Sequence, residues 1–190
     1  IRTVVVRGLD VAVQNDMDSG IIRKFADVLA LQTETNTANL AAIVRAVTVW
    51  EAGFRLQTNY QPTRSQLFAT LSEYPWLRDV ARDSSAASRG CGLPPSVIGL
   101  CWWLFSRIDS EDAGHFFARL GDGQSLVKGQ PVYELRRTVI GTRDARGSRA
   151  RTFLTAITIK AWNAYREGAT VTVLGFRPGG AKPERFPDPK

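Results

Sequence analysis

Apolar side chains recur every three or four positions along most of this chain, the spacing that puts them on one face of an α-helix. In one clear case Leu40, Ile43 and Val47 lie on the same helical face, and Gly53 ends the pattern. The periodicity predicts nine helices, at residues 10–17, 20–31, 37–53, 63–74, 76–87, 96–108, 110–120, 131–142 and 148–167.

Local signals refine several of these helices. Thr63 and Gln66 form a capping box, in which the hydroxyl accepts a backbone N–H and the glutamine side chain reaches back. Asp109 or Ser110 is expected to cap the helix that follows. Helix 96–108 is apolar nearly all round, so we expect it to be the central buried helix.

The last helix, 148–167, carries an apolar stripe wide enough to dock on a core, with Trp162 on its flank. The stripe comprises Phe153, Leu154, Ile157, Ala161, Ala164 and Tyr165. Two short strands are predicted near the ends of the chain, at 3–7 and 170–176. The segment 177–190 has four prolines and is expected to be extended or loose. The fold class is therefore mainly α, a multi-helical globular domain with one or two short β-strands near the termini.

Small and polar residues at 84–95, with glycines and prolines, are typical of a linker. They predict an N-terminal part at 1–83, a helical core with an arginine-rich loop at 93–176, and an extended tail at 177–190. A single compact domain is the alternative. Because there is no Met at position 1 and the chain enters an expected strand almost at once, we also expect residues upstream of Ile1.

Charge is the strongest functional signal. The chain has a net charge of +7 and a sequence pI near 9.9. Residues 1–95 carry ten Lys and Arg against nine Asp and Glu, whereas residues 96–190 carry fifteen against nine. Six arginines gather at the end of helix 131–142 and the start of helix 148–167, with Asp144 as the acid among them. These predicted nucleic-acid-binding residues are Arg136, Arg137, Arg143, Arg146, Arg149 and Arg151.

Catalytic signatures are missing from the sequence. His115 is the only histidine, and Cys91 and Cys101 do not have a zinc-binding spacing. There is no P-loop and no dinucleotide fingerprint, so hydrolase and oxidoreductase functions are disfavoured and no cofactor is expected. The two cysteines and the lack of a signal peptide indicate reduced thiols in the cytoplasm. The longest uncharged run, 90–106, is too short to span a bilayer as a helix.

A second site candidate lies near the N-terminus. Asp18, Ser19 and Gly20 break one helix and open another, which leaves backbone N–H groups free at the new helix start. Arg23 and Lys24 follow one turn later and would supply positive charge to a phosphate. The alternative is a helix junction with a solvated basic pair, which local spacing favours.

This region resembles the distal part of a ParB-like domain. In that family a strand and a short helix lead to a Glu-Asn-x-x-Arg box that contacts nucleotide phosphates and metal. Asp18, Ser19 and Arg23 fall where the box would fall, with Asp-Ser in place of Glu-Asn. An upstream arginine-bearing box would lie before Ile1. The whole chain also resembles ParB-like proteins of actinobacteria and their phages, whose helical C-terminal region ends in sequences similar to 159–166 and 177–180.

These observations favour a non-enzymatic DNA-binding accessory or regulatory protein that contacts phosphates through the arginine-rich loop. Helix 63–74 or 76–87 could enter a groove of the duplex. Two alternatives stay open. One is a protein-interaction module, such as a phage or host regulatory factor. The other is a ParB-like protein that depends on CTP or ATP. DNA is the expected partner, a protein partner or a homodimer is compatible with the sequence, and no membrane is expected.

Overall fold

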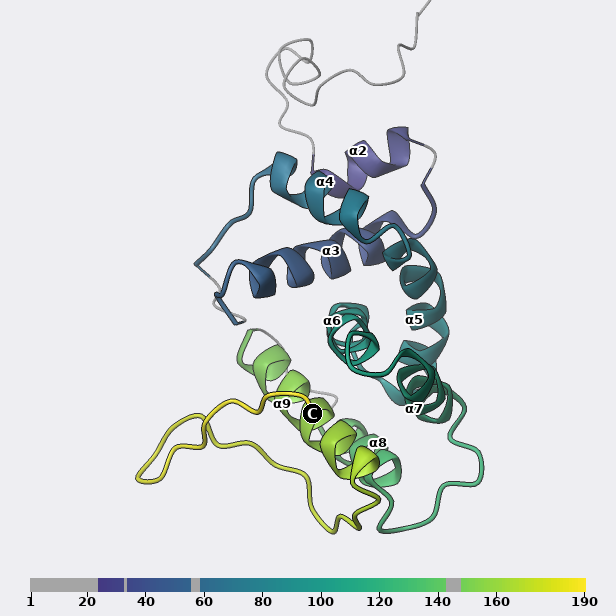
Figure 1. Cartoon of the computed structure of the whole chain (residues 1–190), viewed down its shortest axis with the longest axis vertical. Helices are drawn as coiled ribbons and strands as arrows, with labels where there is room; N and C mark the ends of the chain where they lie inside the picture. The colour runs from purple at the N-terminus through teal and green to yellow at the C-terminus, as the bar shows by residue number, and fades with distance from the viewer. Residues whose placement is uncertain (1–23, 33, 56–58, 143–147) are drawn as a thin grey trace, which may run out of the picture.

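The computed structural model describes residues 24–32, 34–55, 59–142 and 148–190 (Figure 1). Within these residues the chain forms eight α-helices and no strand, so the mainly helical class is confirmed. The helices are α2 (Phe25–Leu31), α3 (Thr37–Glu51), α4 (Arg64–Glu73), α5 (Leu77–Cys91), α6 (Pro95–Ser106), α7 (Ser110–Asp122), α8 (Pro131–Gly141) and α9 (Ser148–Arg166). The predicted helix 10–17 and strand 3–7 lie outside the described residues.

Helix α6 is the centre of the fold, as its apolar composition predicted. It contacts α3, α5, α7 and α9, and Figure 1 shows it enclosed by these helices. Gly99 allows α3 to approach closely, because a Cβ there would lie 2.5 Å from Cγ1 of Ile43. On the other side Phe105 stacks on Trp162 with ring centroids 4.4 Å apart. Buried residues from Leu29 to Phe176 form one hydrophobic cluster around this helix.

The predicted linker at 84–95 is wrong, because α5 continues through it to Cys91 and only a short connection precedes α6 at Pro95. The small residues serve helix packing instead. A Cβ on Gly90 would overlap the carbonyl oxygen of Gly121 and lie 3.1 Å from its carbonyl carbon. A Cβ on Gly121 would in turn meet the backbone of Ala87 at 3.4 Å. Helices α5 and α7 therefore cross at backbone contact distance.

The predicted strand at 170–176 is also wrong. Leu174 and Phe176 are buried, Gly175 between them is partly exposed and Val173 before them is exposed, so burial alternates over residues 173–176. The alternation arises because every second side chain packs against the helical body, with no neighbouring strand among the described residues. The backbone of this segment bonds to loops and side chains instead: Val171 N–H donates to the carbonyl of Gly129 at 2.8 Å.

The last helix corrects one further expectation, and the tail is extended as expected. Trp162 was expected on the flank of the apolar stripe, but it is fully buried. Thr155 and Thr158 are buried as well, so α9 is enclosed on more than one face. The tail supplies the additional cover. It is extended but not loose, because it returns across α9 after an outward loop (Figure 1). Among the described residues, no helix is both long enough and apolar enough to cross a membrane.

Candidate functional site

Arg136 is held by the ends of two other helices. Its guanidinium donates hydrogen bonds to the carbonyls of Leu120 and Gly121, in the last turn of α7. It also donates to the carbonyl of Gly90, in the last turn of α5, at 3.0 Å. A cation is favoured there, since the free carbonyls of a helix C-terminus carry partial negative charge. Arg136 thus fastens α8 to α5 and α7.

Arg137 is tied to a buried carboxylate. Its Nε lies 2.7 Å from Oε2 of Glu134, whose side chain is 1% exposed. The same guanidinium donates to the carbonyl of Thr172 at 3.0 Å, which fixes the start of the tail on α8. The second carboxylate oxygen of Glu134 accepts the backbone N–H of Gly129 at 3.3 Å. A buried carboxylate needs such partners, so Arg137 has a clear structural task.

Of the other four predicted arginines, only Arg151 has a side chain among the described residues. Arg151 is exposed in the first turn of α9. Arg149 belongs to the same turn, but its side chain lies outside the described set, as do Arg143 and Arg146 entirely. The first turn of α9 contains no acidic residue. Two arginines therefore stand at the helix end where the backbone dipole is positive.

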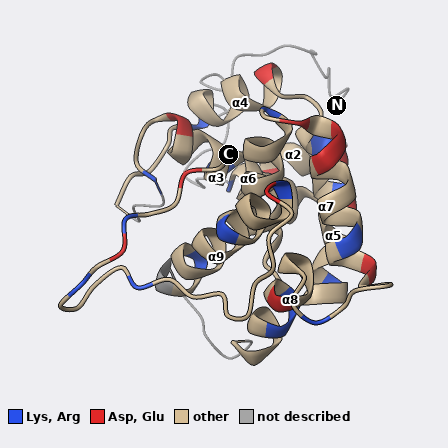
Figure 2. Ribbon diagram, turned by 60° about the horizontal axis from the view of Figure 1, so that its bottom comes forward, with Lys and Arg blue, Asp and Glu red and all other residues tan. Residues whose placement is uncertain are grey.

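The net charge of the molecule is confined to its C-terminal third. Residues 1–130 carry 13 Lys and Arg and 13 Asp and Glu, whereas residues 131–190 carry 12 and 5. Figure 2 shows the basic positions along α9 and the tail. The described acids of this region are all in ion pairs: Glu134 with Arg137, Glu167 with Lys190, Glu184 with Lys160, and Asp188 with Arg55 and Arg185.

Basic residues in the tail were missed by the sequence analysis. Arg177 and Lys182 are exposed and lie in the irregular stretch that follows α9. The backbone closes a loop within this stretch, because Glu184 N–H donates to the carbonyl of Arg177 at 2.7 Å. Only the proline and glycine content of the segment signalled a loop. Its position beside α9 depends on contacts that sequence patterns do not show.

Of the two helices expected to enter a DNA groove, α5 meets Arg136 in its last turn, whereas α4 does not lie near the arginines of α8. Helix α4 is at the opposite end of the molecule from α8 (Figure 1). The capping box at its start is confirmed, with the N–H of Gln66 donating to the hydroxyl of Thr63.

The N-terminal phosphate candidate is only partly in view. Asp18, Ser19, Gly20 and Arg23 lie outside the described residues. Lys24 is exposed and precedes the first residue of α2. Its backbone N–H donates to the carboxylate of Asp27 at 3.0 Å. An acid of the chain itself thus occupies the start of this helix, as in an ordinary capped helix end.

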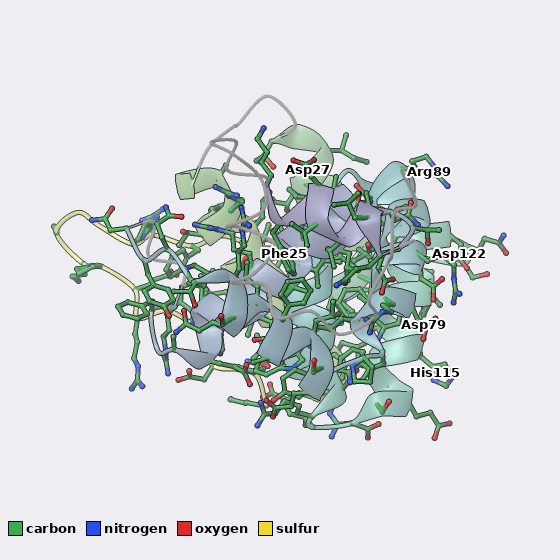
Figure 3. The ribbon with its side chains drawn as sticks, turned by 90° about the horizontal axis from the view of Figure 1, so that it is seen from above. Phe25, Asp27, Asp79, Arg89, His115 and Asp122 are labelled. Carbon is green, nitrogen blue, oxygen red and sulfur yellow. The ribbon has the colours of Figure 1, made fainter. Side chains whose placement is uncertain are left out.

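Side chains with catalytic potential are dispersed. His115 is exposed on α7 and points outward (Figure 3). Cys91 and Cys101 are free and buried, and burial raises the pKa of the Cys101 thiol. Such a thiol is a poor nucleophile because little thiolate forms. Within the described residues no three His, Cys, Asp or Glu side chains lie together as metal ligands would.

An open pocket of about 460 Å³ lies beside the start of α8. Its lining includes Arg119, Lys128 and Tyr165. Arg119 bonds to the side-chain oxygen of Gln130 at 3.1 Å. Tyr165 is distant in sequence from Arg119 and Lys128, so no local pattern could have grouped all three.

Comparison of the chain with protein-family models, with curated proteins and with solved structures finds no match. The resemblance to ParB-like proteins accordingly stays a prediction from the quoted motifs. The charge distribution and the contacts around α8, α9 and the tail are the remaining basis for a functional conclusion.

Proposed function

We propose that this protein binds DNA through its phosphates, as an accessory or regulatory protein that performs no catalytic step. The observation that carries the proposal is the charge distribution: residues 131–190 account for the whole net charge of +7, and residues 1–130 are neutral. A cationic surface on one end of a folded protein attracts a polyanion and accelerates the encounter with it.

The start of α9 supports contact with phosphate. Arg149 and Arg151 stand in a first turn that has no acid. A cation at this end of a helix costs roughly 0.3–1 kcal/mol through the helix dipole, so these arginines do not serve helix stability. A phosphate oxygen would instead be attracted both by the free backbone N–H groups of the turn and by the guanidinium groups.

Arg136 and Arg137 contribute by another route. They bind α8 to the ends of α5 and α7 and to the tail. A frame held by these bonds orients the first turn of α9 relative to the core. Their own contact with DNA, and that of Arg143 and Arg146, stays a prediction. The link to ParB-like proteins would place the molecule in DNA partition or regulation.

Phosphate contacts position a protein on DNA but do not read bases. The full chain should therefore bind two duplexes of unrelated sequence with similar affinity in a fluorescence anisotropy titration at low salt. R149Q/R151Q should weaken binding to both duplexes by the same factor. A variant that lost affinity for one duplex only would contradict contact by phosphate alone, and wild type without affinity for either would refute the proposal.

A further inference from the structure

The last residues of the described chain are held on the helical body like a bound peptide. We call residues 183–190 the C-terminal segment. The docking face beneath it is formed by Trp50, Arg55, Lys160, Trp162, Asn163 and Glu167. Figure 1 shows the end of the chain lying across α9.

The side-chain amide of Asn163 hydrogen-bonds to the backbone of the segment both as a donor and as an acceptor. Asn163 donates from Nδ2 to the carbonyl of Asp188 at 2.9 Å, and its Oδ1 accepts the N–H of Lys190 at 2.9 Å. Trp162 adds a bond from its indole N–H to the carbonyl of Lys190 at 2.9 Å. These three bonds recognise an extended main chain whatever side chains it carries. They also satisfy the buried Trp162 donor, which would be costly to leave without a partner.

Every second side chain of the segment meets a matching group on the face. Glu184 pairs with Lys160 at 2.7 Å, Asp188 with Arg55 at 3.1 Å and Lys190 with Glu167 at 3.2 Å. Between the two acids, Phe186 packs edge-on against Trp50 and Phe176, with centroids 5.8 Å and 5.5 Å away. In an extended peptide every second side chain points to the same side, so this alternation is typical of an extended peptide that is contacted along one face. The pattern is acidic, aromatic, acidic, basic at alternate positions.

The contacts that hold the segment are weak enough for the segment to leave its docking face. Its ion pairs are partly exposed, and such pairs contribute little individually. The loop that connects it to the body contains Pro178, Gly179 and Gly180, all exposed. A short tether of this kind gives the segment an effective concentration on the order of millimolar at its own docking face. Local release is thus compatible with an intact core.

We propose that the docking face is a peptide-binding site, which the chain's own C-terminal segment occupies until an extended segment of another protein displaces it. The fitting partner carries an acidic, an aromatic, an acidic and a basic side chain at alternate positions. This inference does not depend on DNA binding, since none of the six predicted DNA-contacting arginines belongs to the docking face.

The test uses the full chain and a labelled synthetic peptide with the sequence of residues 183–190. In F186A the anchor of the tethered segment is removed, while the docking face is unchanged. Because the internal competitor is weakened, F186A should bind the peptide at least about tenfold more tightly than wild type does. A peptide that carries the same F186A substitution should not bind, and N163D in the protein should reduce binding.

Absence of binding to F186A at about 1 mM peptide, with a helical circular dichroism spectrum like that of wild type, would overturn the proposal. So would a concentration-dependent dimer of wild type that F186A abolishes, because the segment would then be exchanged between copies. Hydrogen exchange of wild type gives a second measurement. The Lys190 amide should exchange by local opening, with little dependence on denaturant. Exchange of this amide only together with the Phe105 amide of the core would also overturn the proposal.

Discussion

Substituting Gly90 by alanine tests the close crossing of α5 and α7. In an unobstructed helix, glycine to alanine stabilises a protein by roughly 0.5–1 kcal/mol. At Gly90 the new Cβ would overlap the carbonyl oxygen of Gly121. Backbone cannot move aside as a side chain can, so the two helices would have to separate by about 1 Å to restore contact distance.

The cost of that separation can be worked from the contacts that it disturbs. Overpacking of an interior contact typically costs about 1–3 kcal/mol. Separation would also strain the hydrogen bond from Arg136 to the carbonyl of Gly90, a charged bond worth roughly 1.5–3 kcal/mol. These costs exceed the gain in helix propensity from glycine to alanine. We therefore expect G90A to lower the free energy of unfolding by about 1–3 kcal/mol.

Gly114 provides a matched control. It also lies inside a helix, α7, but nothing would come within 4 Å of a Cβ there. G114A should therefore raise the free energy of unfolding by roughly 0.5–1 kcal/mol. Urea denaturation followed by circular dichroism measures both changes. If G90A proved as stabilising as G114A, the α5–α7 crossing would be refuted and the linker interpretation of residues 84–95 would be revived.

Three further predictions concern the core, the cap of α7 and nucleotides. F105A should lower the free energy of unfolding by roughly 3–5 kcal/mol, since Phe105 is fully buried; a denaturant midpoint like that of wild type would contradict this. A hydrogen bond from the N–H of Asp112, together with Arg166, lowers the pKa of Asp109 in the folded protein. The ionised Asp109 carboxylate therefore stabilises the fold fully above its unfolded pKa of about 3.9. This stabilisation is lost as the pH falls through the lower pKa of the folded protein. The stability difference between wild type and D109N should accordingly shrink from pH 7 to pH 3 in urea titrations, and a constant difference would refute the assignment. CTP or ATP with Mg²⁺ at about 1 mM should leave the melting temperature unchanged, because Asp18-Ser19 stand where the proposed resemblance to ParB-like domains would place Glu-Asn; a clear upward shift would show that nucleotide binds.

Features set by neighbouring residues could be predicted from the sequence. The capping box needs only Thr63 and Gln66, three positions apart, and it forms as expected. The central position of α6 follows from its own apolar surface.

Features set by distant partners could not be predicted. Small residues at 84–91 are typical both of loops and of close helix contacts, and only Gly121 across the crossing decides between them. Trp162 lies off the apolar stripe of its helix, and its burial requires the tail to cover that side. Arg136 looked like a surface cation, but its acceptors include Gly90, 46 positions away. Charge patterns showed where the arginines are, but not which of them the fold already uses.

The central claim is that arginines around the start of α9 contact DNA phosphates, and the salt dependence of binding tests it most directly. Anisotropy titrations between about 50 and 200 mM salt should be made on wild type and on R143Q/R146Q/R149Q. R78Q/R82Q/R89Q removes the same number of charges from α5 and serves as the control. If all three arginines touch phosphate, the slope of log affinity against log salt should flatten by roughly three units in the first variant and stay unchanged in the control. An unchanged slope in R143Q/R146Q/R149Q, or no affinity of wild type at about 50 mM salt, would contradict DNA binding through these residues.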